Sequence, residues 1–197
     1  MKVLVGCESS GKVRQAFRDI GHDAWSCDLL TPDDGSDYHI QGDVMTLLND
    51  GWDLAVFHPP CTYLSVSGMH WTTRGLRDPQ LTEDALIFVQ TLLNAPIPKI
   101  ALENPVSVIS SRIRKPDQII QPWWFGDDAS KKTCLWLKNL PPLRPTNMLH
   151  GDNKTRRGNQ TASGQNKLAP SKDRWKKRSE TYQGIANAMA EQWGGLC

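Results

Sequence analysis

The chain has 197 residues, 39% of them hydrophobic, which is enough for one α/β domain with a full core. No apolar run approaches the length of a membrane span, and the apolar segment at residues 3–7 is too short for a signal peptide. We therefore expect a cytoplasmic protein with no membrane partner. The five cysteines are an odd set without a close pair, which argues against a disulfide framework and a zinc site.

Basic residues are concentrated near the C-terminus, although the net charge is only +2. Residues 154–178 contain nine basic side chains and one acid, so this segment carries +8 and the rest of the chain −6. An acidic body with one basic strip is typical of a protein that meets a polyanion on one face. The alternative is a solvated loop without a partner. The candidate nucleic-acid contacts are Lys154, Arg156, Arg157, Lys167 and Arg174.

The N-terminal part predicts a strand, a turn, a helix and a second strand. Residues 2–7 are apolar and β-branched, and apolar residues recur at helical spacing over residues 12–20, with Gly21 as the C-cap. The second strand, residues 24–27, ends at Asp28. An acid at the tip of the second strand of a βαβ unit suits an adenosyl ribose, whose two hydroxyls a carboxylate can bind. Because the full glycine fingerprint is missing, a doubly wound fold without a ligand there remains the alternative.

A second acid follows at Gly42-Asp43-Val44, before the short apolar segment 45–48. At the end of a third strand, Asp43 could hydrogen-bond an adenine while Val44 contacts its ring. The same residues also occur in plain surface turns. The apolar residues 53–57 then predict another strand.

Two prolines and a cysteine follow this strand directly, in His58-Pro59-Pro60-Cys61. The prolines fix φ twice and remove two backbone donors, so the chain leaves the sheet in a stiff, extended form. Ligands of open α/β sheets bind beyond the carboxyl ends of the strands, which is where Cys61 is expected. The alternative is a buried structural cysteine, since free cysteine is among the most buried residue types.

A carboxylate ends the next predicted strand. Residues 81–93 repeat apolar side chains at helical spacing, as in a crossover helix, and the strand at 99–102 runs into Glu103-Asn104-Pro105. If the two strands are neighbours, Cys61 and Glu103 converge at one crevice and form a candidate site.

The remaining elements complete the predicted domain. The aromatic cluster at 123–125 favours core or hinge packing over a base-stacking platform, and residues 134–137 predict a strand. We expect one catalytic domain over residues 1–197, with an α/β core at 1–145, a basic loop region at 146–180 and a C-terminal helix at 181–195 that packs back on the core.

These motifs resemble those of DNA cytosine-5 methyltransferases. Residues 59–68, with Pro-Pro-Cys and the later Ser and Gly, are similar to the catalytic motif of the family, and Glu103-Asn104-Pro105 is similar to its Glu-Asn-Val motif. Residues 7–11, Asp28 and Asp43-Val44 resemble its S-adenosylmethionine motifs, and residues 184–187 resemble the last one. The ordered resemblance covers most of the chain.

The resemblance implies a Rossmann-like S-adenosylmethionine-dependent methyltransferase fold with a mostly parallel doubly wound sheet. It also implies methyl transfer to carbon 5 of cytosine in DNA, in a bacterial or phage-infected cytoplasm. Cys61 would add to carbon 6 of the ring, a protonated Glu103 would bind nitrogen 3, and Lys132 would replace a family arginine. The implied S-adenosylmethionine contacts are Cys7, Glu8, Ser9, Gly11, Asp28, Asp43, Val44, Pro59 and Asn187.

The DNA partner is expected to be a duplex with a flipped cytosine, or a single strand. Three departures from the family concern the substrate: Thr62 follows the cysteine where many members have Gln, the Gln-x-Arg-x-Arg motif is replaced by Ser130-Lys131-Lys132-Thr133, and no large target-recognition domain is present. Recognition is then short and loose, or supplied by a partner protein. RNA or a pyrimidine nucleotide as substrate, and a catalytically inactive DNA-binding protein, remain the alternatives.

Overall fold

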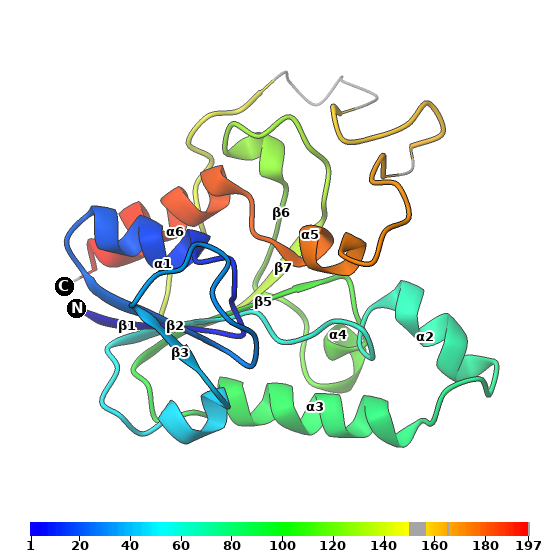
Figure 1. Cartoon of the computed structure of the whole chain (residues 1–197), viewed down its shortest axis with the longest axis horizontal. Helices are drawn as coiled ribbons and strands as arrows, with labels where there is room; N and C mark the ends of the chain where they lie inside the picture. The colour runs from blue at the N-terminus through cyan, green and yellow to red at the C-terminus, as the bar shows by residue number, and fades with distance from the viewer. Residues whose placement is uncertain (150–156, 165, 197) are drawn as a thin grey trace.

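A computed structural model of the chain describes residues 1–149, 157–164 and 166–196. Within these residues a seven-stranded sheet has the order β3-β2-β1-β4-β5-β7-β6 (Figure 1). The strands are β1 (Lys2–Gly6), β2 (Asp23–Asp28), β3 (His39–Gln41), β4 (Leu54–Phe57), β5 (Lys99–Pro105), β6 (Gln118–Ile120) and β7 (Thr133–Lys138). The first five pair in parallel, whereas β7 pairs antiparallel with β5 and β6. The predicted mostly parallel, Rossmann-like fold is confirmed.

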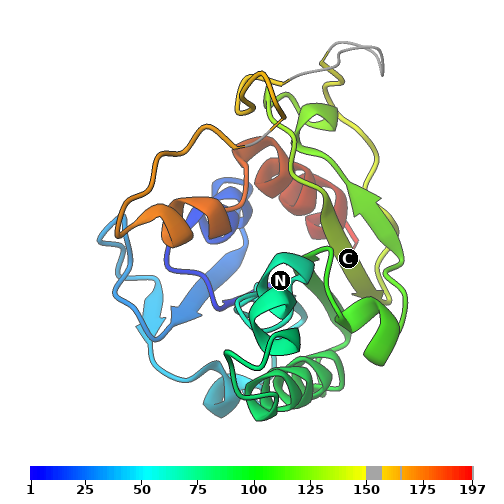
Figure 2. The ribbon, with the colours of Figure 1, turned by 90° about the vertical axis from the view of Figure 1, so that its right-hand side faces the viewer.

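Helices cover both faces of the sheet. The helices α1 (Lys12–Asp19) and α6 (Gln183–Gly194) pack on one face, and α3 (Gln80–Leu93) packs on the other (Figure 1). Side chains alternate along each strand accordingly: Val3 and Val5 belong to the first core and Leu4 to the second. Because helices cover both faces, a ligand can reach the sheet only at the ends of its strands or along its outermost strands. Figure 2 looks onto the side of the molecule that carries α2, the helix that follows β4 in the chain.

Several short elements were not predicted. They are α2 (Val66–Thr73), α4 (Ile109–Arg112), α5 (Arg174–Ser179), the 3-10 helices η1 (Val44–Leu47) and η2 (Pro122–Trp124), and the strand β6. The expectation of loop throughout the basic region is wrong at α5. The expected core packing of the aromatic cluster is confirmed at Trp123 and Phe125, which are buried. No helix in the described part of the chain is long and apolar enough to cross a membrane.

Candidate active site

The register between β4 and β5 brings a histidine and a glutamate together. Phe57 lies opposite Leu102, so the next residues along the two parallel strands, His58 and Glu103, are neighbours on the face covered by α1 and α6. The His58 Nδ1 lies 3.2 Å from the Glu103 Oε2, and the two side chains are only 8% and 9% exposed. The sequence argument quoted His58 but gave it no role.

The loop that carries Cys61 is fixed on both sides. The Asn104 Nδ2 donates a 2.8 Å hydrogen bond to the carbonyl of Pro59, which ties the loop to β5. Ser65 caps α2 by accepting from the amide of Gly68, and a Cβ at Gly68 would lie 2.3 Å from the Thr62 carbonyl oxygen. The half-buried Cys61 is therefore held at the carboxyl end of β4.

The charge of Glu103 acts on the Cys61 thiol. Burial raises the pKa of the Cys61 thiol, and the negative charge of Glu103 raises it further, against the weaker opposing effects of Lys131 and Arg178. Burial also pushes the pKa of Glu103 upward. The hydrogen bond from His58, the charge of Lys131 and a hydrogen bond with Thr133 outweigh it, so the pKa of Glu103 is lowered.

The free protein thus holds a protonated thiol beside an ionised carboxylate. The protonated Glu103 expected from the family resemblance is not the form that these surroundings favour before a substrate binds.

Lys131, rather than its neighbour Lys132, faces this pair. The positive charge of Lys131 acts on both Cys61 and Glu103, and its Nζ donates to the carbonyl of Glu180 at 3.2 Å. Lys132 is exposed and acts instead on the buried Cys134. The sequence signal for Lys131 was the Lys-Lys pair itself, which does not say which lysine points toward the site.

Three of the residues predicted to bind a cofactor lie close together at the ends of β1 and β2 and in the loop after β3. Burial raises the pKa of the Cys7 thiol, and the charges of Asp28 and Asp43 raise it further. Burial, and then the charges of the same two acids, raise the pKa of Cys27 to about 11. Asp43 also caps η1 by accepting from the amide of Met45 at 2.9 Å, and Val44 is buried. This edge presents two acids beside a turn in which Cys7 has a positive φ of 59°.

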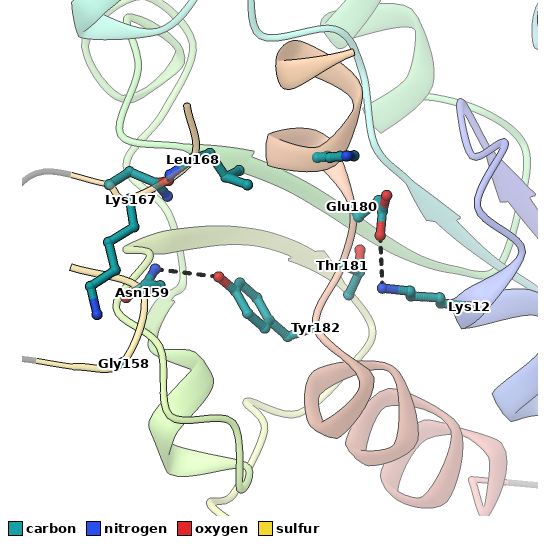
Figure 3. Close-up of a pocket in the computed structure, with 10 residues that line it drawn as sticks. Lys12, Gly158, Asn159, Lys167, Leu168, Glu180, Thr181 and Tyr182 are labelled. Carbon is teal, nitrogen blue, oxygen red and sulfur yellow. Dashed lines mark hydrogen bonds and ion pairs between the residues drawn. The ribbon is translucent and has the colours of Figure 1, made fainter. Parts of the chain in front are cut away.

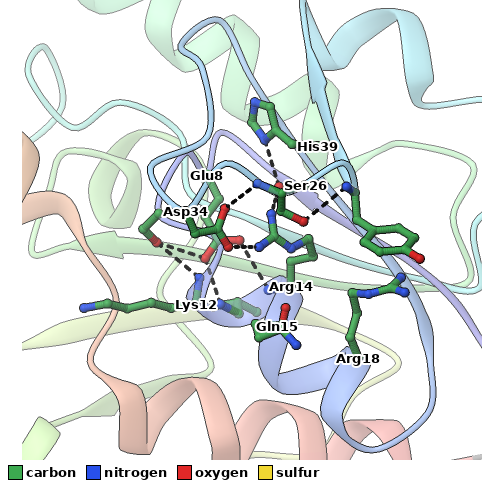
Figure 4. Close-up of polar contacts among 12 residues, drawn as sticks. Glu8, Lys12, Arg14, Gln15, Arg18, Ser26, Asp34 and His39 are labelled. Atoms are coloured by element: carbon green, nitrogen blue, oxygen red, sulfur yellow. Dashed lines mark hydrogen bonds and ion pairs between the residues drawn. The ribbon is translucent and has the colours of Figure 1, made fainter.

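Glu8 caps the first turn of α1 (Figure 4). The Glu8 Oε1 accepts from the amide of Val13 at 2.8 Å and from the Ser10 hydroxyl, and Oε2 accepts from the amide of Arg14 at 3.3 Å. Glu8 is only 5% exposed. Dinucleotide-binding folds place a diphosphate at this helix N-terminus, but here the chain supplies its own carboxylate.

A buried arginine fixes the loop that follows Asp28 (Figure 4). Arg14 is fully buried, donates to the Ser26 hydroxyl at 3.1 Å and forms an ion pair with Asp34. Gly11, with φ 71°, lies so close that a Cβ would be 2.4 Å from the Arg14 Nη2. The amide of Asp33 donates to the carbonyl of Ser9, so the same loop is also joined to the β1–α1 turn. These contacts fix the loop after Asp28 to α1 and to the β1–α1 turn.

The other predicted cofactor contact, Asn187, lies on α6. It is exposed and accepts a 2.9 Å hydrogen bond from Gln183 one turn earlier. Its role in binding stays a prediction, as does that of the buried Pro59.

A cavity of about 340 Å³ lies between the start of α1, the α5–α6 connection and residues 158–159 and 166–168 (Figure 3). At its wall the Lys12 Nζ pairs with Glu180 at 2.8 Å, and the Asn159 Nδ2 donates to the Tyr182 hydroxyl at 3.4 Å. Glu180 is also the residue whose carbonyl binds Lys131, so the cavity borders the active site.

The predicted nucleic-acid contacts are distributed unevenly. Lys154 and Arg156 lie outside the described residues. Arg157 is 6% exposed, and its guanidinium lies 4.2 Å from the Trp123 ring centroid, a position that favours a packing role. Lys167 is exposed at the cavity, and Arg174 is half-buried at the start of α5. Among the described residues of the basic segment, Arg178 on α5 acts on the Cys61 thiol.

No protein-family model and no curated protein matches the chain. Among solved structures, it is similar to a crystal structure from E. coli described as a candidate DNA modification methyltransferase encoded within a prophage. The identity is 12% and the TM-score 0.45, and the match covers 68% of this chain and 45% of that one. The chain therefore spans less than half of that protein, and a likeness at this level does not establish an activity.

Proposed function

We propose that the protein transfers a methyl group from S-adenosylmethionine to carbon 5 of cytosine in DNA, through a covalent adduct between Cys61 and carbon 6. The observation that carries this proposal is the coupling of Cys61 and Glu103 at the ends of adjacent parallel strands. Carbon 5 of cytosine is too weak a nucleophile to take a methyl group directly. A thiol that adds to carbon 6 and a carboxyl group at nitrogen 3 together overcome this weakness.

The ionisation of the pair supplies the proton that this chemistry needs. In the free protein the raised pKa of Cys61 favours the thiol, and the lowered pKa of Glu103 favours the carboxylate. When the sulfur–carbon 6 bond forms, the S–H bond breaks, and its proton passes through Glu103 to nitrogen 3. The electron pair displaced from the ring double bond makes carbon 5 nucleophilic. After methylation, solvent water takes the carbon 5 proton, the electron pair of the broken C–H bond restores the ring double bond and expels the thiolate, and the nitrogen 3 proton returns through Glu103 to the sulfur.

The edge beside Cys7 fits the methyl donor. In this proposal Asp28 would bind the two ribose hydroxyls, and Asp43 and Val44 would contact the adenine. Glu8 fills the place of a diphosphate, which suits a cofactor without phosphate groups. When bound, the cofactor supplies an electrophilic methyl group. The chain's own part is to hold the base over Cys61 and to keep Glu103 within reach of nitrogen 3.

DNA would approach from the side of α2 and α5. Helix α2 has no buried residue, and exposed apolar side chains lie in and after it at Val66, Trp71 and Leu76. Arg74, Lys177 and Arg178 add positive charge from exposed positions. Phosphate contacts of this kind give affinity without sequence preference. The target base must be flipped out or single-stranded, because its carbon 6 cannot be reached inside a duplex.

The test is to incubate the protein with duplex DNA containing 5-fluorocytosine and with labelled S-adenosylmethionine. Fluorine at carbon 5 blocks the final elimination, so the adduct is trapped. We expect a labelled protein–DNA adduct that is lost in Cys61→Ala and retained in Cys134→Ala, a matched change at a buried cysteine on β7. Tight DNA binding without an adduct would favour the inactive DNA-binding alternative. Transfer to RNA or to a pyrimidine nucleotide alone would favour the other one.

A further inference from the structure

His58 occupies a position that the sheet determines closely. Its amide donates to the carbonyl of Gly6 at 2.9 Å, which extends the β1–β4 pairing by one residue. Pro59 follows and restricts the His58 backbone to an extended form. The imidazole lies over β5, where its Nδ1 is 3.2 Å from the Glu103 Oε2.

The rest of the imidazole is poorly satisfied. The Nε2 atom of His58 is buried and has no hydrogen-bond partner in the described part of the chain. A buried polar atom without a partner is costly, and an apolar side chain would fill this space without that cost. The single polar contact of the ring, from Nδ1 to Glu103, accounts for a histidine here.

We propose that His58 is a positioning residue: its buried contact with the Glu103 carboxylate holds Glu103 in the orientation in which it would meet the substrate base. This inference rests on the proposed function for its catalytic consequence, but the coupling of the three side chains is a property of the free protein. In this role His58 acts through Glu103, its hydrogen-bond partner.

The expected effect follows from the groups that face Glu103, namely His58, Lys131, Cys61 and Cys134. Without the His58 donor, burial dominates and the pKa of Glu103 rises. A thiol beside a neutral carboxyl is more acidic than one beside a carboxylate, so the alkylation rate of Cys61 plotted against pH must bend where Glu103 loses its proton. That bend reports the ionisation of Glu103 without any catalysis.

The experiment compares the wild type with His58→Leu, which removes the donor, and His58→Asn, whose Nδ2 can take the place of the imidazole Nδ1. Iodoacetamide labelling of Cys61 is followed against pH by peptide mass spectrometry, with Cys27 and Cys134 as internal reports of intact packing. A Glu103→Gln variant should lack the bend. We expect the bend to move up by about one to two pH units in His58→Leu, the size for one hydrogen bond to a charged group, and to stay in place in His58→Asn.

On 5-fluorocytosine DNA, His58→Leu should form the adduct about 10- to 100-fold more slowly at unchanged KM for DNA, and His58→Asn should restore the rate. An unmoved bend in His58→Leu, or a His58→Asn variant that behaves like His58→Leu, overturns the inference. If labelling of Cys27 and Cys134 shows that His58→Leu is misfolded, His58→Met replaces it as the donor-free variant. Absence of any adduct in the wild type would refute the proposed function, whereas the bend would still decide the role of His58.

Discussion

The substitution Glu8→Ala tests whether Glu8 acts as a helix cap. It removes the acceptors of the Val13 and Arg14 amides, which lie in the first turn of α1 under a side chain that is 5% exposed. Each buried donor left without a partner costs about 1–3 kcal/mol, and water entering the space would recover part of it. We therefore expect a loss of about 2–4 kcal/mol in the free energy of unfolding. Glu8→Gln keeps one acceptor oxygen and should lose about half as much.

Urea unfolding followed by circular dichroism measures this loss as a lower midpoint at an unchanged m-value. Glu191→Ala is the matched control, because Glu191 is exposed on α6 and its removal should stay within about 0.5 kcal/mol. Calorimetric titration with S-adenosylmethionine completes the test, and Glu8→Gln should bind it nearly as tightly as the wild type. If Glu8→Ala costs less than about 1 kcal/mol while the donor affinity collapses, Glu8 is a cofactor ligand and not a cap.

Three further changes have expected outcomes. Gly11→Ala should destabilise the protein by at least about 1–2 kcal/mol in the same unfolding assay, because φ is 71° and a Cβ would lie 2.4 Å from the Arg14 Nη2. Lys131→Ala should raise the pKa of both Cys61 and Glu103 in the alkylation profile, whereas Lys132→Ala should leave both pKa values unchanged. Equal effects of the two substitutions would contradict the conclusion that Lys131 is the lysine that acts on Cys61 and Glu103. The rate of adduct formation should rise with pH through the lowered pKa of Glu103, remain level, and fall through the raised pKa of Cys61. The reason is that the active form has Glu103 ionised and Cys61 protonated. A rate that keeps rising with pH as the thiol ionises would exclude this form.

Strands were predicted correctly where nearly all of their residues are buried, because burial requires an unbroken run of apolar residues. All four residues of β4 are buried, as are all but the first of β1, so their apolar runs could be recognised as strands of a parallel sheet. Helix α2 left no such pattern, because no residue in it is buried and its start depends on the Ser65 cap. Helix α5 was also missed. Tertiary ion pairs hold it, including one between Lys176 and Asp33, residues that are far apart in the sequence.

The site could be predicted as far as the strand ends, and no further. That Cys61 and Glu103 would converge follows from two consecutive parallel strands that lie side by side. The partner of Glu103 depends on the register to a single residue, because a shift by one would turn His58 to the other face of the sheet. The ionisation of Glu103 depends in turn on that partner, and this is why the sequence argument expected a protonated acid and the structure favours a carboxylate.

The two views of Glu103 describe different moments of one reaction. In the proposed reaction the carboxyl group carries a proton when it meets nitrogen 3, whereas in the free protein the raised pKa of Cys61 and the lowered pKa of Glu103 favour a thiol and a carboxylate. Attack by the sulfur must release the thiol proton at the same moment that nitrogen 3 becomes basic enough to accept one. In the proposed reaction a carboxylate at Glu103 is therefore better suited than a carboxylic acid, because it can take the proton from Cys61 and pass it on without drawing one from solvent.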